Sequence, residues 1–147
     1  MNFENKGLRT KNEITLSLAR KIIDAVKIEA EKIGVKAVVA VSDSAARIIS
    51  VDSMDDAYVA SYDIAVNKTF TCASLKMPTK ILKHLSQPGA DLYGIQNTNE
   101  GKIVIFGGGE PLFYNGECVG AVGVSGGSEA EDTYLGEVGL KKFEEEI

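Results

Sequence analysis

The side chains best suited to hold a small ligand fall on one polar stripe in residues 57–75. Asp63, Asn67 and Thr71 are spaced four apart, and Lys68 flanks them. Side chains at this spacing share one face of a helix. Asp63 and Lys68 can orient the carboxylate or hydroxyl groups of a ligand through charge-assisted hydrogen bonds. A solvated helix face has the same spacing and is the simpler interpretation, so burial of Asp63 or Lys68 would favour a pocket.

The main chain of a triple glycine is a second candidate for ligand contact. Gly107, Gly108 and Gly109 lead to Pro111 and a strand. A phosphate cradle or dinucleotide motif would instead lead from a strand into a helix. We interpret the triple glycine as a turn or bulge. The alternative is close approach of its main chain to a ligand or to a neighbouring subunit.

A third candidate is the stretch Ser125, Gly126 and Gly127, which runs from a predicted strand into a helix start at Ser128. Amides at such a position bind anions. However, the first helical turn is rich in acidic residues, which the helix dipole favours and which would repel a phosphate. We therefore favour helix capping here over anion binding.

Two aspartates give the sequence a possible acid or base. Asp43 ends a predicted strand, although Asp before Ser-Ala-Ala is also an ordinary turn residue. Asp63 is the other candidate, with Lys68 as an electrostatic anchor for a small hydroxy acid, an aldehyde or a corrinoid intermediate. No carboxylate pair or nucleophile motif accompanies either residue. A non-catalytic protein is the favoured interpretation.

The sequence offers few ligands for a metal. His84 is its single histidine and lies in a segment with the pattern of an amphipathic helix, which favours a surface or structural role. Cys72 and Cys118 are isolated, without the paired spacing of a zinc or redox motif. We predict no metal site. His84 remains the most obvious axial ligand if haem binds.

The predicted elements that would position these residues form an α+β domain. Amphipathic spacing predicts a helix over 15–33 that ends at Gly34. Residues 57–75 contain no Gly or Pro and are too many for a normal strand, so we predict a second helix there, and a short helix over 79–86 after Pro78. A hairpin of strands 36–43 and 47–52 lies between the first two helices. Strands 102–106, 111–114 and 117–125 follow, joined by the triple glycine and by Asn115-Gly116. Ser128 and Glu131 then form a capping-box pattern that opens the last helix.

Length and charge limit the classes of function. The 147 residues fit one domain, of which residues 1–13 form a possible loosely ordered extension. A net charge of −5 argues against nucleic acid as a partner. No apolar run is long enough to span a bilayer, and the first ten residues lack a signal-peptide pattern. We expect a cytoplasmic protein without a membrane partner.

Several segments in order resemble the GlcG/HbpS haem-binding family, whose domain also forms the C-terminal part of PduO-type corrinoid adenosyltransferases. The most specific are SYDIAVNKTFT at 61–71, KIVIFGGGEPL at 102–112 and VGAVGVSGG at 119–127. The resemblance covers residue 14 to the C-terminus. The sequence departs from it at Ala45-Ala46, where members commonly have a glycine pair. It also departs at Ser53, where an arginine would offer a partner for a propionate.

The resemblance implies a profilin-like layered fold with a five-stranded antiparallel sheet, and homo-oligomers that are often of high order. It also implies haem or tetrapyrrole binding, and an accessory role beside glycolate, diol or cobalamin enzymes. The alternatives are an enzyme that uses an aspartate and a structural partner of a metabolic assembly. The ligand contacts we expect are Asp63, Asn67, Lys68, Thr71, Gly107, Gly108, Gly109, Ser125, Gly126 and Gly127.

Overall fold

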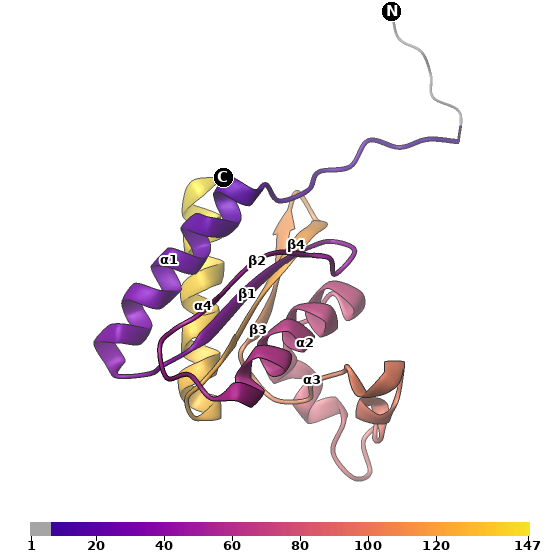
Figure 1. The fold of residues 1–147 in the computed structure, drawn as a ribbon. Helices are drawn as coiled ribbons and strands as arrows, with labels where there is room; N and C mark the ends of the chain where they lie inside the picture. Colours follow the sequence, from indigo (N-terminus) through magenta and orange to yellow (C-terminus); the bar gives the residue numbers. More distant parts are fainter. Residues whose placement is uncertain (1–6) are drawn as a thin grey trace, which may run out of the picture.

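The structure, a computed structural model that describes residues 7–147, is a four-stranded antiparallel sheet between two helical layers (Figure 1). The strands are β1 (Val38–Asp43), β2 (Ile48–Ser53), β3 (Gly109–Tyr114) and β4 (Glu117–Ser125), in the order β2-β1-β4-β3. Helices α1 (Leu16–Ile33) and α4 (Glu129–Glu146) pack together on one face of the sheet. Helix α2 (Val59–Leu75) covers the other face, and α3 (Thr79–Leu85) follows it.

The predicted first helix forms because its ends are capped and one face is apolar. The Thr15 hydroxyl accepts a hydrogen bond from Leu18 N, and Gly34 closes the other end with φ of 74° and a bond to Ala30 O. The buried face is made of Ala19, Ile22, Ile23, Val26 and Ala30. Each large aliphatic side chain buried there stabilises the fold by roughly 1.5–3 kcal/mol. This face joins α4 and the sheet in the main hydrophobic core.

The prediction of five strands is wrong, because residues 102–106 do not join the sheet. Val104 N donates to the Thr71 hydroxyl of α2 at 2.9 Å, and the Lys102 ammonium lies 5.6 Å from the Phe70 ring centre. Ile103 and Val104 are buried. The apolar side chains of this segment are thus buried against α2, and its backbone does not pair with a neighbouring strand.

The triple glycine is therefore not a connection between two strands. Gly109 is the first residue of β3, and Gly108 O accepts a hydrogen bond from Val124 N at 2.9 Å. The other predicted helices and strands are present with small shifts in their bounds. Asn115 and Gly116, with φ of 49° and 77°, make the predicted tight turn between β3 and β4.

Residues 7–13 extend away from the body of the fold in Figure 1. Residues 1–6 of the extension predicted over 1–13 lie outside the described residues; residues 7–13 are exposed and form no helix or strand. The body begins at Ile14, whose N–H donates to Val119 O at 3.0 Å. Among residues 7–147, no helix has the length and apolar character needed to cross a membrane.

Candidate functional site

Lys68 lies at the centre of a buried clamp between α2, β4 and α4, which we define as Lys68, Asp132, Phe106 and the Val124 carbonyl. The Lys68 side chain is 0% exposed. Its Nζ donates to Val124 O at 2.7 Å, lies 3.4 Å from Asp132 Oδ2, and stands 5.0 Å from the Phe106 ring centre. An ammonium has three N–H donors; the two oxygens accept hydrogen bonds from it, and the Phe106 ring adds a cation–π contact.

Three glycines make room for the lysine. A Cβ on Gly108 would lie 2.6 Å from Lys68 Nζ, and one on Gly109 would lie 2.7 Å from Cys72 Sγ. A Cβ on Gly123 would overlap Ala65 O. The close main-chain approach that the sequence suggested is therefore present, and its target here is α2 of the same chain.

The turn of Ser125, Gly126 and Gly127 binds a carboxylate of the same chain, that of Asp132. Gly127 N donates to Asp132 Oδ1 at 2.8 Å. Beside it, the Ser128 hydroxyl accepts from Glu131 N at 3.2 Å while Glu131 Oε1 accepts from Ser128 N at 2.9 Å. The predicted capping box is confirmed. One face of the Asp132 carboxylate binds the turn and the other faces Lys68, so it joins α4 to α2.

Burial dominates the electrostatics of the clamp. Desolvation lowers the pKa of Lys68, and the negative charge of Asp132 opposes that shift. Desolvation also raises the pKa of Asp132, opposed by the Lys68 charge and the turn amides. Each charge therefore depends on the other for compensation, and removal of either leaves an unpaired charge in the interior.

A cavity of about 280 Å³ lies beside the clamp. Tyr58, Ile64 and Phe106 give it an apolar wall, and Ser61, Ser125 and Asp132 give it a polar floor. The Ser125 hydroxyl donates to the Ser61 hydroxyl at 3.2 Å. The two serine hydroxyls bind each other, while the Asp132 carboxylate binds Gly127 N and faces Lys68.

The structure separates the predicted polar stripe of α2. Asp63 is exposed, Asn67 is half-buried and Thr71 is buried. Lys68 faces the sheet instead, and Asp63 does not line the cavity beside it. The structure thus brings together Lys68, Gly107 to Gly109 and Ser125 to Gly127, while Asp63 points to solvent on another face of the helix.

The residues that sequence reasoning missed are Phe106 and Asp132 of the clamp and Ser61 of the cavity beside it. A signal for the buried face existed in α2, where Ser61, Ala65 and Cys72 are small and lie at helical spacing around Lys68. A stripe of small residues marks the face that packs closely, and Lys68 falls on that face. Asp132 had no comparable signal, because acidic residues are ordinary in the first turns of a helix.

Asp43 and His84 lie away from this cluster. Asp43 Oδ1 accepts hydrogen bonds from Ala45 N and Arg47 N, both at 2.9 Å, so it closes the turn between β1 and β2 as the favoured interpretation predicted. His84 is exposed on α3.

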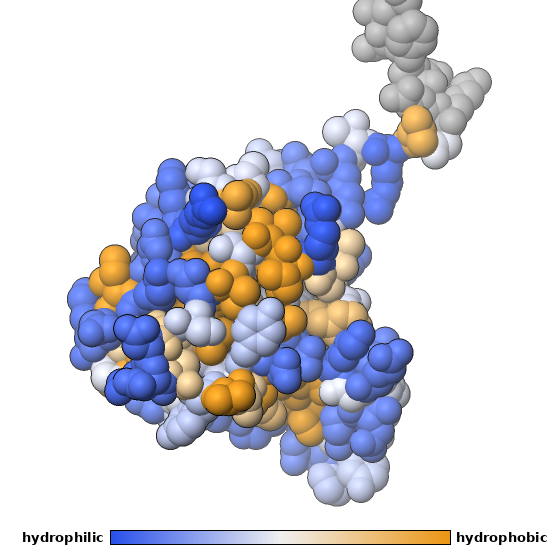
Figure 2. Space-filling view, viewed as in Figure 1, coloured by the Kyte–Doolittle hydropathy of each residue, from blue (hydrophilic) through white to orange (hydrophobic). Residues whose placement is uncertain are grey.

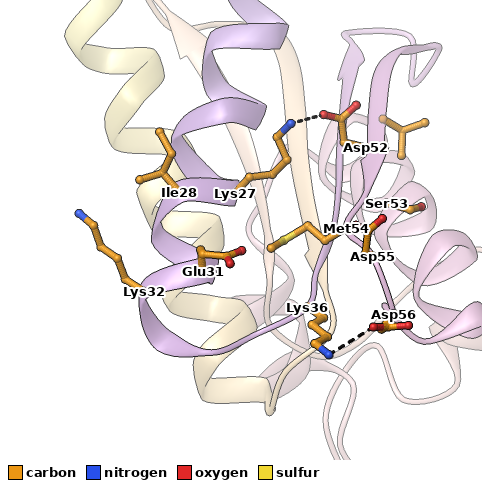
Figure 3. A pocket seen from close by; sticks show the side chains of 11 residues that line it. Lys27, Ile28, Glu31, Lys32, Lys36, Asp52, Ser53, Met54, Asp55 and Asp56 are labelled. Carbon is orange, nitrogen blue, oxygen red and sulfur yellow. Dashed lines mark hydrogen bonds and ion pairs between the residues drawn. The ribbon is translucent and has the colours of Figure 1, made fainter.

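An open groove lies between α1 and the end of β2, shown in Figure 3 and called here the α1–β2 groove. Its volume is about 950 Å³. It is lined by Lys27, Ile28, Glu31, Lys32, Lys36, Val51, Asp52, Ser53, Met54, Asp55 and Asp56. None of the predicted ligand contacts lies here, although Ser53, noted for its departure from the family pattern, does.

Carboxylates already lie against the lysines of this groove. Lys27 Nζ donates to Asp52 Oδ2 at 2.6 Å, and Lys36 Nζ lies 3.5 Å from Asp56 Oδ2. The hydrogen bond with Asp52 is the main reason that the pKa of Lys27 is raised. The groove therefore places ammonium groups where carboxylates can reach them.

Met54 gives the groove an apolar, sulfur-containing wall. Its side chain extends from the end of β2 toward α1 in Figure 3 and packs against the main core. Its Sδ accepts a hydrogen bond from Ala37 N at 3.4 Å, which uses one of the two lone pairs of the thioether.

Comparisons with known proteins agree with this fold. The chain is 46% identical over 132 residues to the "Uncharacterized 15.0 kDa protein in dhaT-dhaS intergenic region" of Citrobacter freundii, covering 90% of this chain and 93% of that protein. The solved structure of Klebsiella pneumoniae ORFY matches with a TM-score of 0.92 and 39% identity, covering 97% of this chain and 98% of that one.

A solved structure described as a PduOC:heme complex matches with a TM-score of 0.85 and 30% identity, covering 88% of this chain and 94% of that one. The resemblance to HbpS and to the PduO C-terminal domain is thus confirmed. The model of the family described as "Haem degrading protein HbpS-like" matches residues 14–141. The chain belongs to the HbpS-like family.

Proposed function

We propose that the protein binds haem or a related tetrapyrrole, without acting as an enzyme, and that the α1–β2 groove holds the ligand. The observation that carries the proposal is the groove itself, because it combines lysines, apolar side chains and a thioether in one hollow of about 950 Å³. Small-molecule sites usually measure roughly 300–1,000 Å³. The likeness to a PduO domain in complex with haem supports the choice of ligand class.

The groove chemistry fits an amphipathic ligand with carboxylates at one edge. Ile28, Val51 and Met54 offer apolar contact to a macrocycle. Lys27 and Lys36 are already in carboxylate contact within the chain, so propionates would replace Asp52 or Asp56 as their partners. Lys32, which lies 3.8 Å from Glu29, is a third cation at the rim.

Met54 is the iron ligand that this groove offers. Methionine sulfur, histidine, cysteine thiolate and tyrosine are the side chains that hold haem iron in proteins. Of these four types, the lining of the groove contains Met54 alone. A bound haem would supply an iron centre able to exchange electrons or to take a further ligand, and the protein would supply one thioether and the lysines.

The clamp and its glycines have a supporting part in this proposal. Lys68, Asp132 and the Gly126–Gly127 turn fix α2 and α4 against the sheet, and the groove adjoins this region because Lys36 and Asp56 also line a cavity with Gly126 and Gly127. In this proposal, the clamp and the turn hold α2 and α4 in place around the ligand and do not contact the iron.

Titration of the full chain with hemin tests the proposal. We expect a shift of the Soret band that saturates at one hemin per chain. Met54→Leu keeps the volume of the side chain but removes the sulfur, so it should weaken hemin binding and change the Soret position. The same variant should leave binding of iron-free protoporphyrin unchanged. Met77→Leu, outside the groove, is the matched control. A wild-type chain that leaves the hemin spectrum unaltered would overturn the proposal.

A further inference from the structure

The two edges of the sheet differ in their ability to accept another strand. The β3 edge contains Pro111, which has no N–H to donate, and α3 contacts β3 through Gly109 N to the Thr79 hydroxyl at 3.0 Å and Lys80 to Glu110 at 3.1 Å. The β2 edge contains no proline over Ile48–Ser53. Edge strands without such protection are templates for pairing.

Hydrogen bonding within the sheet fixes which groups of β2 face outward. Met54 N donates to Ala37 O at 2.9 Å, and Asp52 lies opposite Val39 in the register with β1. Because inward and outward groups alternate along an antiparallel strand, Val51 and Ser53 direct their N–H and C=O away from β1. These are the groups that another strand would bind.

The surface around this edge is apolar. Ile48, Ile49 and Val51 of β2 are half-buried. In the view of Figure 2, hydrophobic atoms gather where Figure 1 places β2 between α1 and α2. An apolar edge strand that is only half-buried is stabilised when a partner covers its exposed apolar surface.

Charge at the two ends of β2 points to a second copy of the same chain. Arg47 precedes the strand with a side chain that is 78% exposed, and it binds Asp43 through Nε at 3.1 Å. Asp55 and Asp56 follow the strand and are both exposed. Antiparallel pairing of two identical strands brings the basic start of each beside the acidic end of the other.

We propose that two copies pair antiparallel through β2, about a two-fold axis at Val51, and that each copy contributes Arg47 to the α1–β2 groove of the other. This register places Ser50 opposite the partner's Asp52 and Arg47 opposite the partner's Asp55. The register shift in β2 near Ile49 moves Arg47 by at most one position, toward Met54. Val51, Asp55 and Asp56 line the groove, so the pair closes its open side and adds a guanidinium there.

The test uses the oligomeric state of the full chain without hemin, so its outcome is independent of ligand binding. We expect light scattering and native mass spectrometry to report an even-numbered assembly. Val51→Pro removes an outward N–H and leaves the β1 ladder intact, so it should dissociate the pair. Phe113→Lys, on the β3 edge, is the control and should leave the mass unchanged. Circular dichroism checks that both variants fold.

Charge exchange tests the register. Arg47→Glu alone and Asp55→Lys alone each set like charges opposite one another twice per pair, so each should weaken pairing by roughly tenfold or more. An equimolar mixture of the two variants restores both contacts in a mixed pair and should recover wild-type affinity. A monomeric wild type, an assembly that survives Val51→Pro, or a mixture no tighter than its components would each overturn the proposal.

Discussion

Lys68 is the residue whose burial depends most on the exact placement of its neighbours. Its ammonium is fully buried, and the contacts with Val124 O and Asp132 are what make that burial tolerable. Pairs of this kind add little net stability, but loss of one partner is severe because the other charge stays inside. The clamp therefore specifies how α2, β4 and α4 meet.

Lys68→Met should lower the free energy of unfolding by about 3–5 kcal/mol, because Asp132 loses its cation in a buried position. Urea unfolding followed by circular dichroism measures the change. The double variant Lys68→Met, Asp132→Leu removes both charges and should recover much of the loss. Equal stability of the single and double variants would contradict the interpretation of the clamp.

Glu110 should give the protein a specific pH dependence. Burial raises the pKa of this carboxyl above its ordinary value of 4.5, and the hydrogen bond with Lys80 opposes the shift. A raised pKa in the folded state stabilises the protein below pH 4.5, and this contribution is lost as pH rises through the folded pKa. Glu110→Gln should therefore gain stability relative to wild type as pH rises from 4.5 toward neutrality. A constant difference between the two chains across that range would be inconsistent with a raised pKa.

At the scale of elements, glycine in β4 decides how closely α2 lies on the sheet. A Cβ at Gly123 would overlap Ala65 O, which belongs to the helix main chain and cannot move alone. Gly123→Ala should therefore cost about 2–3 kcal/mol of stability through overpacking.

Gly116→Ala is the matched control for this change, measured by thermal unfolding. A methyl group on Gly116 would have nothing within 4 Å, so only the φ of 77° opposes alanine there. We expect the smaller loss for Gly116→Ala, about 1 kcal/mol. The opposite order would show that α2 does not depend on a close approach at β4.

The elements with strong local signals were predictable from the sequence. Thr15 and Gly34 mark the ends of α1, Asn115-Gly116 marks the hairpin, and Ser128 with Glu131 marks the start of α4. Residues 102–106 were assigned wrongly because an apolar run shows that a segment is buried without showing what covers it. Here the cover is α2, through Thr71.

The candidate site was only partly predictable for a related reason. Lys68 and both glycine stretches converge as their residue types suggest, but their partners come from distant segments, above all Asp132. The α1–β2 groove depends on α1 and β2 lying side by side, which no local pattern specifies. Contacts between segments that are distant in the sequence, and not local secondary-structure propensity, bring these groups together.

At the scale of the whole molecule, pairing through β2 and ligand binding in the α1–β2 groove should be coupled. If a second copy closes the groove, hemin binds the pair better than the single chain, and by linkage hemin strengthens pairing equally. The hemin dissociation constant should therefore rise when the protein is diluted below its pairing constant. Val51→Pro should remove this dependence on concentration. Identical hemin affinity for paired and single chains would separate the two properties.

The most direct test of the proposed function is a crystal structure of the full chain grown with hemin. We predict the macrocycle between α1 and β2 against Val51 and Met54, with propionates at Lys27 or Lys36 and iron at Met54 Sδ. Hemin bound elsewhere, for example at His84, or crystals without bound hemin at saturating concentration, would contradict the assignment of the groove.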